Sequence, residues 1–204
     1  MRYTIFDTPV ISPLIHVLSS FFMKLLGWRV EGKLPDDNKV VVIAAPHTSN
    51  WDLPILLSVA FELDIEARWL GKRSLFQGPL GFLSSWMGGI PVDRSASQNL
   101  VAQSVEMFRN RERLFLAIPP EGTRGKVTNW KTGFYYIALG AGVPIALGFI
   151  DYKRKASGLG PAIHPTGNIE EDMKIFRNFY ANVTAKYPEK ASLPSVAPNH
   201  VPER

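Results

Sequence analysis

The sequence contains no cysteine. This absence excludes a disulfide framework, a thiolate-ligated zinc site, an iron–sulfur cluster and a cysteine nucleophile. The sequence also lacks the G-x-S-x-G, H-E-x-x-H, G-x-G-x-x-G and Walker phosphate-loop patterns, which disfavours α/β-hydrolases, zinc proteases, dinucleotide-binding proteins and P-loop enzymes. Any chemistry must therefore use serine, threonine, histidine, lysine or carboxylate side chains.

Two uncharged stretches are long enough to be considered as membrane spans. Residues 74–92 and 132–150 each contain nineteen residues without a charge, a length that allows a span. Glycines and prolines interrupt both stretches, so we expect them to form parts of a soluble fold. The first ten residues include Arg2 and Asp7 and precede no small-residue cleavage site. We therefore expect no secretory signal and a protein on the cytosolic side.

The composition is that of one folded domain. The 204 residues are 46% hydrophobic and 20% charged, which is close to the averages for soluble proteins and far from those of disordered chains. The formal net charge is +5, and residues 67–150 hold 10 basic and 4 acidic side chains. A basic surface there would attract the phosphates of nucleic acid, anionic lipid or a small substrate. A solvated face that only aids solubility is the alternative.

Short β-branched runs alternate with helical patterns along the chain. The clearest strand is Lys39–Ala45 (KVVVIAA), which reads as a strand buried on both faces. Further strands are predicted at Ala67–Leu70, Ile90–Val92, Leu114–Ile118 and Val143–Ile150. The predicted helices are Trp51–Glu62, Ser74–Met87 with an interruption at Gly78-Pro79, Gln98–Asn110, Trp130–Leu139 and Ile169–Tyr187. This alternation predicts an α/β fold with a mixed, mostly parallel sheet flanked by helices.

The N-terminal segment Ser12–Trp28 is predicted to be an amphipathic helix. Its polar residues recur every three or four positions and leave a broad apolar face. No acidic residue occurs between Asp7 and Glu31, and Lys24 lies near the end of the segment. This composition suits insertion into a lipid interface. A helix that covers the domain core is the alternative, and both descriptions can hold in part.

The strand Lys39–Ala45 runs directly into the sequence PHTSNWD, in which His47 precedes Asp52 by five positions. In one regular helix these side chains would point about 140° apart, so they can meet only if the backbone breaks between them. We expect Asn50 to cap the next helix and Asp52 to lie in its first turn, where the helix dipole keeps the carboxylate ionised. Asp52 could then accept the Nδ1–H of His47 and leave Nε2 free to take a proton. Such a pair is a general base for a substrate hydroxyl; a strand-end histidine held by ordinary hydrogen bonds is the alternative.

Two further loops follow predicted strands and carry arginine. The run Leu114–Ile118 leads into a loop with four candidate ligand-binding residues, Glu121, Gly122, Thr123 and Arg124. Ligands bind at the carboxyl ends of strands in α/β sheets, glycine lets backbone N–H groups approach an anion, and arginine binds an anion with two hydrogen bonds. The sequence GGIPVDR ends a second short strand at Arg94. A turn with a surface salt bridge is the alternative for both loops.

Taken in order, the segments PHTSNWD, GGIPVDR, PEGTR and GVPIALG resemble the four sequence blocks of the glycerolipid acyltransferase family, which includes the lysophosphatidic acid acyltransferases. The resemblance extends over about Lys39–Ile150, and the N-terminal segment is similar to the helical membrane-binding element of short bacterial members. It implies a glycerol-3-phosphate acyltransferase-like fold. On this basis residues 1–30 are expected to form a membrane-associating helix, residues 31–187 the acyltransferase domain and residues 188–204 a proline-rich extended tail.

The resemblance also implies an activity and the residues that carry it. The expected enzyme moves a fatty acyl chain from acyl-CoA or acyl carrier protein to the hydroxyl of a lysophospholipid, first of all 1-acylglycerol-3-phosphate. His47 would be the catalytic base and Asp52 its orienting partner. The residues expected to bind substrate are Lys72, Arg94, Glu121, Gly122, Thr123 and Arg124. The acyl carrier is a co-substrate, no metal or cofactor is expected, and the enzyme would work at the cytoplasmic face of an anionic membrane as a peripheral or monotopic protein.

Departures from the family pattern keep other functions open. Ile118 and Pro119 precede the PEG stretch where members commonly have an aromatic residue, and Gly125 follows where they have serine. Another lysolipid, such as a lyso amino-acid lipid, is therefore an alternative acceptor. A non-catalytic lipid- or nucleic-acid-binding module and a hydrolase that uses water are further alternatives, although the basic residues lack the aromatic interleaving of nucleic-acid binders. The uncharged segment Leu75–Met87 is a candidate wall for the acyl chain or an ordinary part of the core.

Overall fold

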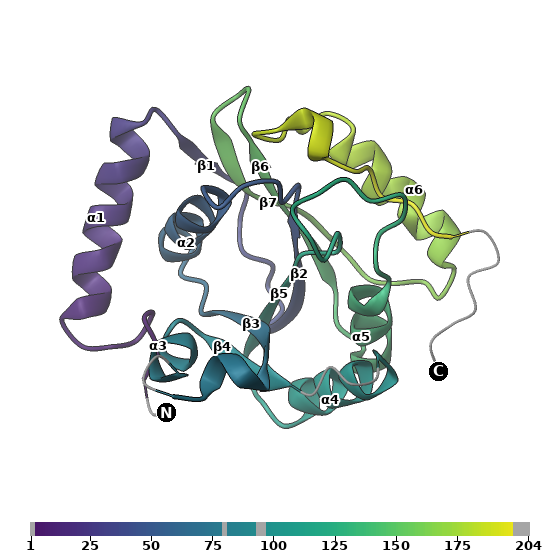
Figure 1. Ribbon diagram of the computed structural model, residues 1–204, viewed down its shortest axis with the longest axis horizontal. Helices are drawn as coiled ribbons and strands as arrows, with labels where there is room; N and C mark the ends of the chain where they lie inside the picture. Colours follow the sequence, from purple (N-terminus) through teal and green to yellow (C-terminus); the bar gives the residue numbers. More distant parts are fainter. Residues whose placement is uncertain (1–2, 79–80, 93–96, 198–204) are drawn as a thin grey trace.

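The computed structural model describes residues 3–78, 81–92 and 97–197, which build one seven-stranded sheet with helices on both faces (Figure 1). The strands are β1 (Arg29–Glu31), β2 (Lys39–Ala45), β3 (Ala67–Lys72), β4 (Gly89–Val92), β5 (Leu114–Ile118), β6 (Ile145–Asp151) and β7 (Ala156–Ile163). Their order across the sheet is β1-β7-β6-β2-β5-β3-β4. The five strands from β6 to β4 are parallel to one another, whereas β7 is antiparallel to β6 and β1 is parallel to β7. The predicted mixed, mostly parallel α/β sheet is confirmed.

The central strands are buried because they are apolar on both faces. In β2, Val41 and Ile43 pack in one hydrophobic cluster, whereas Val40 packs in another. All seven residues of β6 are buried. Continuous apolar runs of this kind are typical of parallel strands that helices cover on both sides.

The helices form two layers. The described α-helices are α1 (Ile11–Leu25), α2 (Asp52–Glu62), α3 (Gly81–Trp86), α4 (Ser97–Arg109), α5 (Gly133–Ala141) and α6 (Ile169–Tyr180), with short 3-10 helices η1 (Arg73–Phe76) and η2 (Pro188–Lys190). Residues of α4, α5 and α6 pack on one face of the sheet in the cluster that includes Phe108, Phe134 and Phe176. On the other face α2 packs against the sheet, and α1 lies outside α2 (Figure 1).

The predicted amphipathic N-terminal helix is present as α1, and only one of its sides covers the core. Met23 is buried against Ile55 and Val59 of α2. Ile15 and Phe22 are half-buried. Five apolar side chains on the other side of α1 are largely exposed, with exposed fractions from 56% to 70% for Leu14, Val17, Leu18, Phe21 and Leu25. Within the described residues, no helix combines the length and apolar character that a membrane span requires.

Several predicted helix boundaries are wrong, and contacts in the structure explain them. The pattern at 74–87 is interrupted at Gly78 as predicted, with a φ of +71° there, but its first half is the short 3-10 helix η1 rather than an α-helix, and its second half is α3. Helix α5 begins at Gly133 rather than at Trp130, and the residues before it are bound to other segments: the backbone N–H groups of Trp130 and Lys131 donate to Ser195 O and Pro120 O. Helix α6 ends at Tyr180 rather than at residue 187. The chain then lies beside the end of β6, where the N–H of Tyr152 donates to Thr184 O.

Candidate active site

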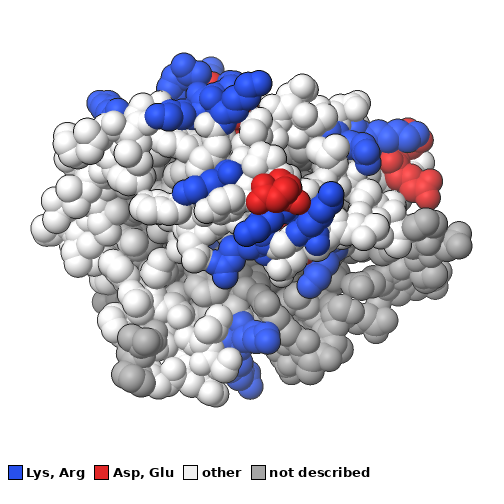
Figure 2. Space-filling view, turned by 45° about the horizontal axis from the view of Figure 1, so that its top comes forward, with Lys and Arg blue, Asp and Glu red and all other residues white. Residues whose placement is uncertain are grey.

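The five parallel strands end at one edge of the sheet, and the loops after them bring the candidate residues together. His47 follows β2, and Glu121 follows β5, the neighbouring strand. Tyr152 follows β6, the neighbour of β2 on the other side. This edge is where α/β sheets bind ligands. Lys and Arg side chains predominate over acidic ones on the face that Figure 2 shows, which is the top of the molecule turned forward.

His47 and Asp52 are in contact, as the interrupted spacing requires. The Nδ1 atom of His47 lies 3.1 Å from Asp52 Oδ2. The Asp52 side chain is fully buried, whereas 27% of the His47 side chain is exposed. Asp52 therefore holds the inner nitrogen of the ring, which leaves Nε2 as the nitrogen that can exchange a proton with a substrate.

Asp52 organises the loop that precedes its helix. The N–H groups of Thr48 and Ser49 donate to Asp52 Oδ2 at 2.9 and 2.8 Å, and Tyr152 Oη donates to Asp52 Oδ1 at 2.7 Å. Burial alone would raise the pKa of Asp52, but the hydrogen bonds from His47, Tyr152 and Ser49 outweigh it and hold this pKa below its ordinary value. The carboxylate is thus ionised at neutral pH, next to the imidazole.

The prediction that Asn50 caps α2 is wrong. Helix α2 begins at Asp52, its N-cap position is Trp51, and no side chain makes a capping hydrogen bond there. The carboxylate of Asp52 instead binds back to the loop, and the N–H of Trp51 donates to Ser49 Oγ at 3.1 Å. The hydrogen bonds from the loop N–H groups to the Asp52 carboxylate therefore hold the irregular backbone between His47 and Asp52.

Glu121 faces inward rather than toward solvent. Its side chain is nearly fully buried, its Oε2 accepts the backbone N–H of His47 at 2.9 Å, and its Oε1 is buried without a hydrogen-bond partner in the described part of the chain. Burial raises the pKa of Glu121 to about 7, despite the opposing hydrogen bond from His47. The resemblance implies a substrate-binding residue here, but the structure places this carboxylate under the His47 loop.

The remaining residues of the same loop lie at the surface. Gly122 has a φ of +65°, a backbone conformation that glycine adopts without strain. Thr123 and Arg124 are exposed, and Thr123 Oγ1 accepts the N–H of Gly125. The guanidinium of Arg124 is therefore available to an anion beside the loop that holds His47.

The other two predicted binding residues stand farther from this centre. Lys72 is the last residue of β3, is exposed, and is aligned with Val92 of β4. Strand β5 separates β3 from β2, so Lys72 lies at the same edge of the sheet but on the far side of the Glu121 loop. Arg94 lies outside the residues that the structure describes. No group of three or more His, Asp or Glu side chains suited to a metal ion occurs among the described residues.

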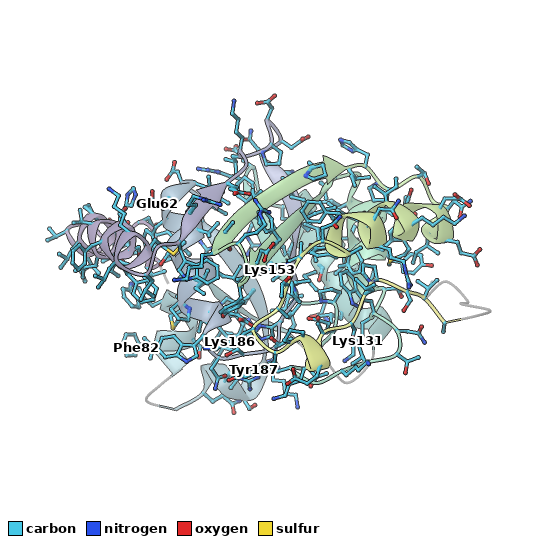
Figure 3. All side chains as sticks on the ribbon, turned by 90° about the horizontal axis from the view of Figure 1, so that it is seen from above. Glu62, Phe82, Lys131, Lys153, Lys186 and Tyr187 are labelled. Atoms are coloured by element: carbon cyan, nitrogen blue, oxygen red, sulfur yellow. The ribbon has the colours of Figure 1, made fainter. Side chains whose placement is uncertain are left out.

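Three contacts at the site were missed by sequence reasoning. Tyr152 binds Asp52, Tyr187 N donates to Thr48 Oγ1 at 3.3 Å, and the Lys186 ammonium lies 5.0 Å from the Trp51 ring centroid. Only Tyr152 had a usable signal, because it lies two positions after the predicted strand Val143–Ile150. Lys186 and Tyr187 come from the segment after α6, which the sequence predicted to be part of a helix. Figure 3 shows Lys131, Lys186 and Tyr187 around η2, seen from above.

The uncharged segment after β3 forms part of the surface. Leu75, Phe82 and Leu83 are exposed by 38% to 62%, whereas Phe76 packs against Trp69. Figure 3 shows Phe82 on the same side of the molecule as α1. The N-terminal segment binds this region directly, because Trp86 Nε1 donates to Thr8 Oγ1 and Ile5 N donates to Trp86 O. The exposed apolar side chains of α3 thus lie near the start of α1.

Comparison with known proteins identifies similar sequences. A family model described as Acyltransferase matches residues 27–146. The 1-acyl-sn-glycerol-3-phosphate acyltransferases of Haemophilus influenzae and Escherichia coli are each 29% identical to the chain over 131 residues. That alignment covers 59% of this chain and 53% and 52% of the two relatives, respectively. The chain therefore matches about half the length of these curated relatives.

A solved structure has a similar fold. The 1-acyl-sn-glycerophosphate (LPA) acyltransferase PlsC from Thermotoga maritima superposes with a TM-score of 0.54 and is 22% identical in sequence. The superposition covers 81% of this chain and 74% of that protein. It therefore extends beyond the residues that match the family model.

Proposed function

The chain belongs to the Acyltransferase family, and from this premise we propose that it is an O-acyltransferase that acylates the hydroxyl of a lysophospholipid. The proposed acceptor is 1-acylglycerol-3-phosphate, which gives phosphatidic acid, because both relatives above are named for acylation of that compound. The proposed donor is a fatty acyl thioester, either acyl-CoA or acyl carrier protein. A thioester is already activated, so the reaction needs a positioned base more than a covalent intermediate.

The observation that carries the proposal is the contact between His47 Nδ1 and Asp52 Oδ2, at 3.1 Å. Because Asp52 binds Nδ1, the imidazole presents Nε2 to the acceptor hydroxyl and takes its proton. The ionised carboxylate stabilises the imidazolium that forms. A base of this kind typically contributes about 10²- to 10⁴-fold to the rate.

The remaining steps follow from this proton transfer. The acceptor oxygen attacks the thioester carbonyl, and a C–O bond forms as the carbonyl oxygen gains negative charge. Collapse of the tetrahedral intermediate breaks the C–S bond, and the thiolate takes the proton from the His47 imidazolium. The products are the ester and the free thiol, and His47 returns to its neutral form.

Basic residues around this edge support a phosphate-bearing acceptor. We propose that Arg124, which is exposed beside the His47 loop, and Lys72, at the end of β3, contribute to binding the acceptor. Arg94 and the Gly122–Thr123 backbone complete the set that the family resemblance implies. We assign Glu121 a different role, because its buried carboxylate binds the backbone of His47 and thus positions the base.

We further propose that the protein works at a membrane surface, on its cytoplasmic face. The exposed apolar side chains of α1 lie opposite the side that packs on α2. Leu75, Phe82 and Leu83 extend the exposed apolar surface near the start of α1. An amphipathic helix of this kind binds in the plane of the lipid interface, and basic residues add attraction to anionic lipid. The lysolipid acceptor is found in the same interface.

Product analysis by mass spectrometry tests the proposed activity. The purified protein is incubated with a long-chain acyl-CoA, or with acyl carrier protein, and a panel of lysolipids that includes lysophosphatidic acid and lyso amino-acid lipids. The wild type is expected to form an acylated product, whereas His47→Ala should lose at least 100-fold in rate and remain folded. His164→Ala, an exposed histidine after β7, is the matched control and should keep wild-type activity.

Two outcomes contradict the proposal. Full activity of His47→Ala shows that His47 is not the base. Free fatty acid without an acylated lipid, from the wild type, shows that water is the acceptor and that the protein is a hydrolase.

A further inference from the structure

We propose that Lys131, a residue outside the four sequence blocks, binds a phosphate group of a bound substrate next to the catalytic base. The inference rests on the proposed function, since the acceptor and acyl-CoA both carry phosphate. It adds a residue that neither composition nor motif spacing singles out. The inference depends on the hydrogen bond that fixes the backbone of Lys131, on the position of its side chain across Gly122 and on the charged residues around its ammonium.

The backbone of Lys131 is fixed to the loop after β5. Its N–H donates to Pro120 O at 2.8 Å, and the N–H of the preceding residue, Trp130, donates to Ser195 O at 3.0 Å. Trp130 is itself buried, and its Nε1 donates to Ser192 O. The bond to Pro120 O holds Lys131 beside the residue that precedes Glu121, although Lys131 lies ten positions after Glu121 in the sequence.

The side chain of Lys131 lies across Gly122. A Cβ atom built on Gly122 would lie 2.8 Å from both Cε and Nζ of Lys131, so the ammonium occupies the space that a side chain would fill. The residue before Gly122 is Glu121, whose Oε2 accepts the N–H of His47 at 2.9 Å. Gly122, which the ammonium covers, thus immediately follows the residue whose carboxylate supports the base.

The Lys131 ammonium forms no ion pair with the described part of the chain. Lys131 is exposed, and within the described part of the chain no carboxylate oxygen lies within 4.0 Å of its Nζ. By contrast, Lys174 on α6 pairs with Glu171. Arg124, two positions after Gly122, is also exposed. An ammonium beside a glycine backbone, with no acidic partner among the described residues, suits phosphate, which lysine binds as a point charge.

Calorimetric binding to soluble probes tests the inference without turnover. The first pair of probes is 1-hexanoylglycerol 3-phosphate and 1-hexanoylglycerol, and the second is 4′-phosphopantetheine and pantetheine. The members of each pair differ only in one phosphate group, so the ratio of the two affinities measures what phosphate contributes. The variants are Lys131→Met, which keeps the apolar stem, Lys131→Arg, which keeps the charge, and Lys126→Met, a control at an exposed lysine of the same loop.

In one of the two probe pairs, Lys131→Met is expected to lower the ratio of the affinities with and without phosphate about tenfold or more, because a hydrogen bond to a charged group is lost. Lys126→Met should leave the ratio unchanged, and Lys131→Arg should keep most of it. A loss in the acylglycerol pair identifies the acceptor as the source of the phosphate, and a loss in the phosphopantetheine pair identifies the donor. Thermal unfolding of Lys131→Met checks that the fold is retained.

Three results overturn the inference: an unchanged ratio in Lys131→Met, an equal loss for the probes with and without phosphate, or a wild type that gains nothing from phosphate in either pair. The second result would show that Lys131 only supports the Gly122 loop. Failure of the proposed function is recognised separately, because it appears as absence of acylated product from the wild type. A wild type that forms product, together with an unchanged ratio, refutes this inference alone.

Discussion

Tyr152 and His47 bind opposite oxygens of the same carboxylate: Tyr152 Oη donates to Asp52 Oδ1 at 2.7 Å, and His47 Nδ1 lies 3.1 Å from Asp52 Oδ2. Because Asp52 is fully buried, the hydroxyl fixes the plane of the carboxylate and therefore the ring that binds its other side. Burial, and after it the Asp52 carboxylate, raises the pKa of Tyr152 well above its ordinary value. Tyr152 is thus a positioning residue for the proposed base.

We expect Tyr152→Phe to lower turnover about tenfold and to destabilise the fold by about 1.5–3 kcal/mol, the range for a lost hydrogen bond to a charged group. The effect on kcat should exceed the effect on KM, because Tyr152 acts through Asp52 rather than on the substrate. Steady-state kinetics and urea unfolding measure the two effects.

Tyr3→Phe, at an exposed tyrosine, is the control and should behave as the wild type. A Tyr152→Phe enzyme with wild-type kcat would show that Asp52 holds His47 without help from Tyr152.

The raised pKa of Glu121 predicts that the free energy of unfolding falls as pH rises toward neutral. The ordinary pKa of 4.5 rises to about 7 in the fold because of burial. Between these values the folded state binds more protons than the unfolded state, so the free energy of unfolding falls as pH rises. A shift of this size corresponds to about 3 kcal/mol, since one pKa unit is about 1.4 kcal/mol. Glu121→Gln does not titrate, and its Oε1 can still accept the N–H of His47.

The measurement is urea unfolding of wild type and Glu121→Gln at pH 4.5 and pH 8. Relative to the wild type, Glu121→Gln should gain about 3 kcal/mol between these two pH values. Glu112→Gln, at an exposed glutamate, should show no such gain. A constant difference between Glu121→Gln and the wild type across the range would mean that Glu121 titrates as an ordinary surface glutamate.

The sequence predicted the contact of His47 with Asp52 because local features determine it. A strand buried on both faces ends just before His47, and the helix containing Asp52 begins shortly after. The same reasoning misplaced the cap, since the loop turns on the carboxylate of Asp52 rather than on Asn50. Patterns of apolar residues thus located the elements, but they could not identify which polar group closes the loop.

Contacts between distant segments could not be predicted in this way. Tyr152 reaches Asp52 only because β6 lies beside β2, a pairing that joins residues about a hundred positions apart. Strand β7 was missed because it includes Gly158, Gly160 and Pro161, which are depleted in strands. The antiparallel pairing of β7 with β6 stabilises it despite these residues. The inward orientation of Glu121 likewise depends on the His47 loop, which lies 74 residues away.

The exposed apolar side of α1 is the surface by which we propose that the enzyme binds a membrane. Leu14, Val17 and Phe21 are at least 57% exposed and do not contribute to the buried core. Each replacement by serine should therefore change the free energy of unfolding by no more than about 0.5 kcal/mol, and all three together by no more than about 1.5 kcal/mol. Each side chain would lose up to about 1.5–3 kcal/mol of transfer into lipid, so partitioning onto vesicles should fall more than tenfold.

Sedimentation with phosphatidylglycerol vesicles measures this partitioning, and Ile175→Ser, at an exposed position of α6, is the control. If the triple variant partitions like the wild type, α1 does not enter the lipid interface, and the basic residues alone must account for any membrane binding.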